Sequence, residues 1–302
     1  MARISLKVDV DTERGTREGV PRIAALLERL GVKATFLFSL GPDHTGRAIR
    51  RVFRRGFVGK VRRTSVMQHY GLRTLLYGTL LPGPHIGRRH VALLRSIADR
   101  GFEVGVHTYD HTRWQDGVVR ADEAWTRREI VRAQAQFTEI FGHAARVHGA
   151  AGWQLNQHVP DLEYELGFQY ASDVRGTTPF MPVIHGLVSR VPQLPTTLPT
   201  LDELLGRLEL PNGEPVEHLT ALMQVPRTDQ VYTLHAELEG GAYLADFERL
   251  LRAWRDQGHE LCDLATQFAS LDPARLPHHD IGFATVEGRA GVLATQGSLR
   301  RG

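Results

Sequence analysis

Short apolar runs alternate along this chain with longer segments of helical periodicity, and this alternation constrains the fold more than any other feature. Residues 4–10 alternate apolar and polar side chains, which is typical of a strand. In residues 18–30 apolar side chains recur every three or four positions, which predicts a helix that ends at Gly31. Further strands are expected at 32–39, 102–106, 145–149, 168–172, 188–194, 230–235 and 259–262. Helices between most of these strands predict an α/β fold with a parallel sheet.

Ionisable side chains stand at the carboxyl ends of several expected strands. Asp9 and Asp11 end the first strand, His107 the third, Asp173 a middle one and His235 a late one. In parallel α/β folds this edge of the sheet carries the functional groups. The pattern favours a distorted barrel, although periodicity by itself fits an open sheet as well.

The sequence Asp9-Val10-Asp11 places two carboxylates at alternate positions of a strand, so both side chains face the same side. Like charges about 7 Å apart along a strand need a cation or a shared proton between them. Taken alone, the pair fits equally well with one carboxylate capping a loop and the other forming an outer salt bridge.

His107 and His111 lie four residues apart, directly after an apolar strand, so their imidazoles can reach one metal ion. Alone, they are equally well explained as two surface histidines. With a carboxylate from another strand end they form a His-His-Asp triad with open coordination positions, which indicates a hydrolytic or oxygenase metal site. Such a site accepts zinc, cobalt, manganese, nickel or iron.

His235 ends the expected strand 230–235 and is followed closely by Glu237. In isolation, a histidine at this position is best explained by a hydrogen bond to a core carbonyl. Beside a metal site, the same histidine is a natural general acid.

Residues 44–98 contain twelve of the 37 lysines and arginines and no acidic residue. Within 47–63, apolar and basic side chains fall on opposite arcs of a helix, which is typical of a helix in a membrane interface. Arginine-rich runs also bind nucleic acid, but the phenylalanines and the apolar run at 72–83 favour lipid. We therefore interpret residues 44–86 as a basic amphipathic insertion that faces an anionic membrane surface, and we expect no nucleic-acid partner.

The single cysteine, Cys262, excludes an intramolecular disulfide and a thiolate zinc site. The sequence has no cleavable apolar leader and no run of about 18 apolar residues. These features predict a cytoplasmic protein, and the basic insertion predicts that it associates peripherally with the inner face of the cell membrane. Residues 272–302 show weak patterning and are interpreted as an extended tail after a domain that covers 1–271.

Five ordered motifs resemble those of the polysaccharide deacetylase family, also described as NodB-homology or carbohydrate esterase 4 proteins. They are DVD at 9–11, HTYDH at 107–111, AAGW at 150–153, SDVRG at 172–176 and TLHAE at 233–237. The resemblance implies a NodB-like, distorted (β/α)7-type barrel and a metal-dependent hydrolase of amide bonds on aminosugars. It also implies one divalent metal ion as cofactor, with zinc, cobalt, manganese and nickel as the candidates.

The resemblance further implies a role for each matching residue. Asp9 matches the catalytic base and His235 the catalytic acid. The metal ligands are matched by Asp11, His107 and His111.

Other matching positions are expected to bind substrate or to orient the catalytic groups. Asp173 matches an acidic residue that orients His235. Family members usually hold the base with an arginine four residues before the glycine of the third motif, but His148 stands there in this chain. Candidates to replace that arginine or to contact substrate are Arg14, Arg175, Trp153, Tyr109 and Glu237.

Residues 9–22, 39–43, 172–176, 193–203 and 235–240 are similar to family members that deformylate an aminosugar carried on a polyprenyl phosphate. This similarity implies that 4-deoxy-4-formamido-L-arabinose phosphoundecaprenol is the substrate, in lipid A modification and polymyxin resistance. The alternatives are an N-acetyl deacetylase of a soluble or polymeric aminosugar, and a catalytically inactive protein that binds lipid-linked sugars.

Overall fold

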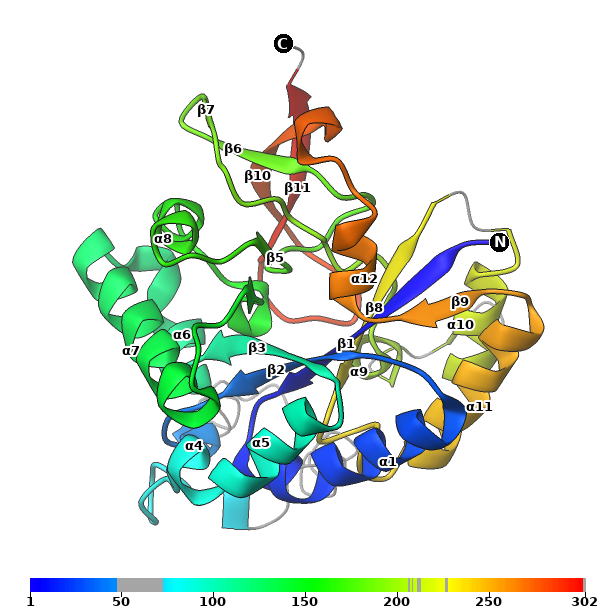
Figure 1. Ribbon diagram of the computed structural model, residues 1–302, viewed down its shortest axis with the longest axis horizontal. Helices are drawn as coiled ribbons and strands as arrows, with labels where there is room; N and C mark the ends of the chain where they lie inside the picture. Colours follow the sequence, from blue (N-terminus) through cyan, green and yellow to red (C-terminus); the bar gives the residue numbers. More distant parts are fainter. Residues whose placement is uncertain (48–72, 206, 208, 211–212, 226–227, 301–302) are drawn as a thin grey trace.

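A curved parallel sheet lies at the centre of the protein (Figure 1). The computed structural model describes residues 1–47, 73–205, 207, 209–210, 213–225 and 228–300. The order across the sheet is β5 (Tyr170–Ala171), β4 (Val147–His148), β3 (Glu103–Thr108), β2 (Thr35–Ser39), β1 (Arg3–Val10) and β8 (Gln230–His235). β9 (Glu260–Cys262) pairs with the first residues of β1, and every pairing in this sheet is parallel.

Residues 192–198 run between the two outermost strands of the sheet. The N–H of Leu194 donates to the carbonyl of Ala171 in β5, and the N–H of Thr197 donates to the carbonyl of Val231 in β8. The sheet therefore curves into a distorted barrel, which confirms the expected fold. The prediction of a strand at 188–194 is largely wrong. Within these fully described residues only the start belongs to a strand, β7 (Leu187–Val188), and this strand is part of a second sheet.

Helices cover the outside of the barrel (Figure 1). α1 (Val20–Leu30) has the expected spacing, because the apolar side chains that recur every three or four positions are buried, and Gly31, with φ of 64°, ends it. Among the described residues, further helices are α4 (Ile86–Arg89), α5 (Val91–Asp99), α6 (His111–Gly117), α7 (Glu123–Phe141), α8 (Val159–Glu165), α9 (Leu201–Leu205), α10 (Pro215–Leu222), α11 (Leu244–Asp256) and α12 (Leu264–Ala269). None of the helices within the described ranges has both the length and the apolar character that a membrane span requires.

The alternation of β1 separates two faces that are both buried. Its apolar residues belong to the hydrophobic core that β1 shares with α1. Its polar residues Ser5, Lys7 and Asp9 are no more than 2% exposed. The polar face of this strand therefore points into the barrel and not into solvent, and it leads directly to the candidate site.

The C-terminal residues form a second sheet and not the extended tail that we expected. β10 (His278–Ala284) and β11 (Leu293–Arg300) pair in an antiparallel hairpin, which joins β7 and β6 (Met181–Ile184) in a four-stranded sheet. The prediction was wrong because most side chains of this hairpin are only half-buried, so an apolar alternation hardly develops. The hairpin docks on the barrel, since the N–H of Arg175 donates to the carbonyl of Ala294.

The basic insertion can be followed only at its two ends. Residues 48–72, which include most of the helix expected at 47–63, lie outside the described residues. The N–H of Asp43 donates to the carbonyl of Pro84, and the N–H of Gly46 donates to the carbonyl of Tyr77. The insertion therefore leaves and rejoins the barrel at one place, next to the end of β2.

Candidate active site

Three residues with metal-ligating side chains converge at the carboxyl ends of β1 and β3. His107 lies within β3, and His111 begins α6, whose first turn is capped by the Asp110 carboxylate. Oδ1 of Asp11 lies 3.2 Å from Nε2 of His107 and 3.3 Å from Nε2 of His111. The side chains that the sequence motifs singled out as ligands therefore meet at one point.

Two contacts hold these side chains in place. Nδ1 of His107 lies 2.6 Å from the carbonyl oxygen of Gly149 and donates to it, which leaves Nε2 directed at Asp11. Oε1 of Glu237 accepts hydrogen bonds from the N–H groups of Asp11 (3.2 Å) and Thr12 (2.8 Å) and from the Thr12 hydroxyl (2.7 Å). Glu237 thus fixes the loop that carries Asp11.

The residues present fit a divalent cation. Oδ1 of Asp9 and Oδ1 of Asp11 are buried and have no hydrogen-bond partner among the described residues. Buried polar atoms of this kind are costly unless another group binds them. Two imidazoles and a carboxylate are a donor set that zinc and related ions accept.

The protonation states also suit metal binding. Burial lowers the pKa of His111, which favours the neutral imidazole that acts as a ligand. Burial alone would raise the pKa of Asp11, but the imidazoles of His111 and His107 outweigh it and hold this pKa well below its usual range.

Asp9 lies beside the triad and is held by a lysine that the sequence analysis did not single out. Oδ1 of Asp9 is 3.8 Å from Nδ1 of His107, and Nζ of Lys7 is 3.5 Å from Oδ2 of Asp9. Lys7 is fully buried and donates to the carbonyl of Ser172 at 2.7 Å. A cation on β1 itself therefore contacts Asp9, the contact for which an arginine had been considered. The signal was available in the sequence, because Lys7 and Asp9 share one face of the strand.

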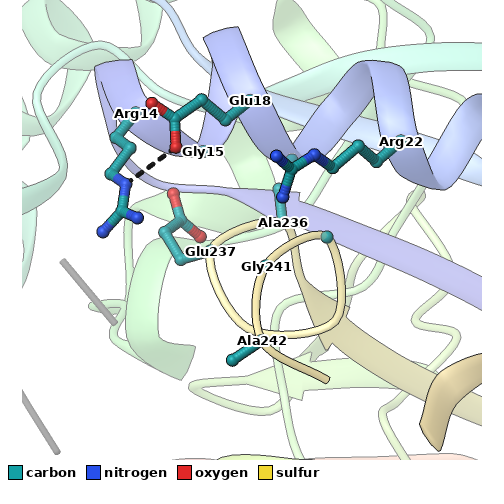
Figure 2. A pocket seen from close by; sticks show the side chains of 10 residues that line it. Arg14, Gly15, Glu18, Arg22, Ala236, Glu237, Gly241 and Ala242 are labelled. Carbon is teal, nitrogen blue, oxygen red and sulfur yellow. Dashed lines mark hydrogen bonds and ion pairs between the residues drawn. The ribbon is translucent and has the colours of Figure 1, made fainter. Parts of the chain in front are cut away.

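The two arginines that we considered for this role lie elsewhere. Arg175 pairs with Glu203 at 2.9 Å, and Arg14 pairs with Glu18 at 2.9 Å. Arg14 lines a pocket of about 260 Å³ between the start of α1 and the loop after β8 (Figure 2). Figure 2 shows Arg14 and Arg22 at opposite ends of this pocket, with the Glu237 carboxyl group between them.

His235 has a different acidic partner from the one that we expected. Nδ1 of His235 lies 3.6 Å from Oδ1 of Asp202. Asp173 instead accepts hydrogen bonds from the N–H of Ala150 and from Nε2 of Gln193, both at 2.7 Å. The prediction for Asp173 was wrong because several carboxylates follow strand ends, and only the tertiary fold decides which of them faces the histidine.

The protonated form of His235 is favoured by its surroundings. Burial by itself lowers the pKa of His235, whereas the carboxylates of Asp202 and Asp11 raise it, and the net shift is upward. The imidazole packs edge to face with Trp153, with 6.2 Å between ring centroids. An imidazolium at this position can donate a proton to a leaving group.

A buried cluster of His148, Glu163 and Asp173 supports the strand end next to the site. Nδ1 of His148 lies 2.6 Å from Glu163 and 3.2 Å from Asp173. Burial lowers the pKa of His148, but the two carboxylates outweigh it and raise the pKa to about 10. His148 is therefore a cation in the position of the family arginine, and it precedes Gly149, whose carbonyl orients His107.

Two aromatic residues from the motifs lie near these groups. Trp153 is buried, and the guanidinium groups of Arg289 and Arg175 lie 4.6 and 5.3 Å from its ring centroid. The hydroxyl of Tyr109 is 3.2 Å from Nε2 of His85.

A parallel barrel with a carboxylate and two imidazoles at the carboxyl ends of its strands is typical of hydrolases that activate water at a metal ion. Comparison with known proteins agrees with this class. The family model described as polysaccharide deacetylase matches residues 4–171, and the chain belongs to this family.

Individual relatives match almost the whole chain. A protein of Shewanella sediminis, named a probable 4-deoxy-4-formamido-L-arabinose-phosphoundecaprenol deformylase ArnD, is 32% identical over 99% of this chain and 96% of its own length. A protein of Wigglesworthia glossinidia brevipalpis with the same name is 30% identical over 93% of this chain and 98% of its own length. Among solved structures, a probable polysaccharide deacetylase from Pseudomonas aeruginosa has a TM-score of 0.58 at 16% identity and covers 88% of this chain and 89% of its own. That structure supports the fold alone.

Proposed function

We propose that this protein is a metal-dependent amide hydrolase that removes the formyl group from 4-deoxy-4-formamido-L-arabinose phosphoundecaprenol. The products are formate and the free aminosugar lipid, in lipid A modification and polymyxin resistance. The observation that carries the proposal is the convergence of Asp11, His107 and His111 beside Asp9 and His235, which are paired in register on β1 and β8. The substrate is supported by the names of relatives that match almost the full chain at 30–32% identity.

The metal ligands in this proposal are Asp11, His107 and His111. A divalent cation bound there would polarise the formamide oxygen and make a water molecule more acidic. The donor set by itself fits zinc, cobalt, manganese or nickel.

Asp9 is the proposed general base. Its carboxylate is buried at the centre of the site, and the Lys7 ammonium at 3.5 Å balances its charge. In this position Asp9 accepts a proton from the water molecule that attacks the formyl carbon.

His235 is the proposed general acid. Without a proton donor the amine would have to leave as an amide anion, which is a very poor leaving group. The net upward shift in the pKa of His235 keeps the imidazole protonated over a wider pH range, so it can donate to the departing nitrogen.

We further infer that residues 44–86 bring the enzyme to the anionic inner face of the cell membrane, which makes it a peripheral, cytoplasmic enzyme. The support is the sequence of this insertion, because its basic residues are accompanied by no acidic residue. A polyprenyl chain stays in the bilayer, so the catalyst has to reach the sugar at the membrane surface.

The experiment compares two sugar lipids that differ only in the acyl group. Purified protein is incubated with the 4-formamido and the 4-acetamido forms, and both are followed by mass spectrometry. We expect the formamido lipid to lose its formyl group and to yield formate, with much slower turnover of the acetamido lipid. Faster turnover of the acetamido lipid would favour the deacetylase alternative. Turnover of neither would favour a binding protein.

A further inference from the structure

The C-terminal hairpin reaches the site through the turn that joins β10 to β11. Arg289 in this turn has Nη2 2.8 Å from Oδ2 of Asp202 and Nε 3.2 Å from Oε1 of Glu203. The turn packs tightly against α9, because a Cβ on Gly288, whose φ is 85°, would lie 2.2 Å from the carbonyl oxygen of Glu203. The hairpin thus places a guanidinium group on the acidic start of α9.

Asp202 connects this guanidinium group to His235. Oδ1 of Asp202 lies 3.6 Å from Nδ1 of His235 and accepts a hydrogen bond from the Thr200 hydroxyl at 2.6 Å. The N–H of His235 donates to Oε2 of Glu239 at 3.0 Å, which anchors the backbone of the histidine. Beyond this backbone anchor, the imidazole ring faces the Asp202 carboxylate through Nδ1 and packs against the ring of Trp153.

We propose that the C-terminal hairpin completes the active site: Arg289 holds the Asp202 carboxylate, and Asp202 orients His235 as the proton donor. This inference rests on the proposed function, specifically on His235 acting as the acid. Asp202 and Arg289 are positioning residues in this arrangement. The segment that resembled a tail in the sequence thereby becomes part of the catalytic machinery.

A role for Arg289 in stability alone explains fewer of its contacts than a role in positioning His235 does. Glu203 is also paired with Arg175 at 2.9 Å, so this buried carboxylate keeps a partner when Arg289 is changed. Arg289 also stacks on Trp153, the ring that packs against His235. The contacts of Arg289 with Asp202 and with Trp153 place it next to the histidine.

The charges around His235 decide the expected direction of its titration. The titratable and charged side chains that face it are Asp9, Asp11, His111, Asp202, Glu237, Glu239 and Arg289. Burial lowers the pKa of His235, Asp202 raises it more than any other neighbour does, and Arg289 lowers it. Asp202→Asn removes that carboxylate, while burial and Arg289 continue to lower the pKa of His235, so this pKa should shift downward.

The experiment measures kcat and KM for the formamido sugar lipid across pH with the metal-loaded enzyme. We expect Asp202→Asn to lower kcat about 10–100-fold. A general acid contributes roughly 10²–10⁴-fold to the rate, and in this variant His235 is displaced but still present. KM should change little, and the alkaline limb of the kcat profile should move to lower pH. Arg289→Ala should lower kcat by a smaller factor, with partial rescue by Arg289→Lys.

The matched control changes another arginine of the same hairpin. Arg300 pairs with Asp280 on the surface at 2.8 Å, so Arg300→Ala perturbs the hairpin without touching α9. This variant should keep the kcat and the pH profile of the wild type. If Asp202→Asn fails to fold, the inference is tested by comparing kcat and its pH profile in Arg289→Ala, Arg289→Lys and Arg300→Ala.

Failure of the inference and failure of the proposed function give different results. His235→Ala is measured in parallel, and retention of turnover in this variant would show that the assigned acid is wrong. Loss of turnover in His235→Ala, together with wild-type kcat and pH profiles in both Asp202→Asn and Arg289→Ala, would overturn the inference alone. An equal loss of kcat in Arg289→Ala and Arg300→Ala would show that the hairpin only stabilises the fold. That result would also overturn the inference.

Discussion

Lys7 and Asp9 lie two residues apart on the inward face of β1, and the lysine ammonium stands 3.5 Å from the aspartate carboxylate. Both side chains are buried, so neither charge is stabilised by bulk water. This pair links the fold to the chemistry, because the strand that pairs with β2, β8 and β9 also carries the proposed base and the cation that balances it.

Lys7→Met tests this relationship. The substitution leaves the Asp9 carboxylate buried without its cation and next to Asp11, so we expect a destabilisation of about 3–5 kcal/mol. Turnover should fall by about 100-fold or more, since a preorganised charge is lost from the site. Urea denaturation and steady-state kinetics measure the two effects. Lys7→Arg keeps the charge and should recover part of the activity; a fully active Lys7→Met enzyme would contradict the role.

Asp9 and His235 should be needed for turnover but not for metal binding. Asp9→Asn keeps the shape of the side chain and removes the base, and His235→Ala removes the acid. Each change should lower kcat by roughly 10²–10⁴-fold, while elemental analysis shows unchanged metal content. Turnover at the wild-type rate in either variant would show that the roles are misassigned.

His148 should make the stability of the protein depend on pH. Its pKa in the folded state is raised to about 10, above the usual value of 6.5. The stabilisation is therefore fully present below about pH 6.5 and is lost as the pH rises through about 10. The free energy of unfolding of the wild type should exceed that of His148→Gln by a few kcal/mol near pH 6. Urea denaturation between pH 6 and pH 10 should show this difference shrinking, and a constant difference would contradict a charged His148.

The basic insertion should control binding to anionic membranes. Changing Arg50, Arg51, Arg54 and Arg55 to Glu reverses four charges, each worth roughly 1 kcal/mol near such a surface. Flotation with liposomes that contain anionic lipid should show the variant released from the membrane. The matched control reverses four exposed arginines elsewhere, Arg120, Arg128, Arg249 and Arg252. Equal membrane binding by the wild type and the insertion variant would argue against this role.

Local pattern was enough to predict the parallel α/β fold and the three side chains that converge at the candidate metal site, whereas the barrel type followed from the family resemblance. The α/β alternation places Asp11 after β1 and His107 at the end of β3, on either side of β2, because parallel strands bring their carboxyl ends to one edge. Lys7 was missed because a polar residue in an alternating strand is usually assigned to the solvent face, whereas the polar face of β1 is enclosed by the barrel.

The partners of His235 depend on contacts that no local pattern records. Asp173 and Asp202 both lie in segments that the sequence analysis had marked, and only the path of residues 192–198 across the barrel brings Asp202 to the histidine. Arg289 arrives from a hairpin whose half-buried strands carry little apolar alternation. Both are long-range features of the tertiary fold.

The central claim is that Asp11, His107 and His111 hold a divalent cation on which deformylation depends. The most direct measurement is elemental analysis of Asp11→Asn, His107→Ala and His111→Ala alongside the wild type, with formate release measured on the same samples. We predict about one equivalent of metal in the wild type, loss of metal and of formate release together in all three variants, and recovery of the chelator-treated wild type on adding a divalent cation. Full formate release from metal-free wild-type protein, or undiminished metal content in the three variants, would contradict the claim.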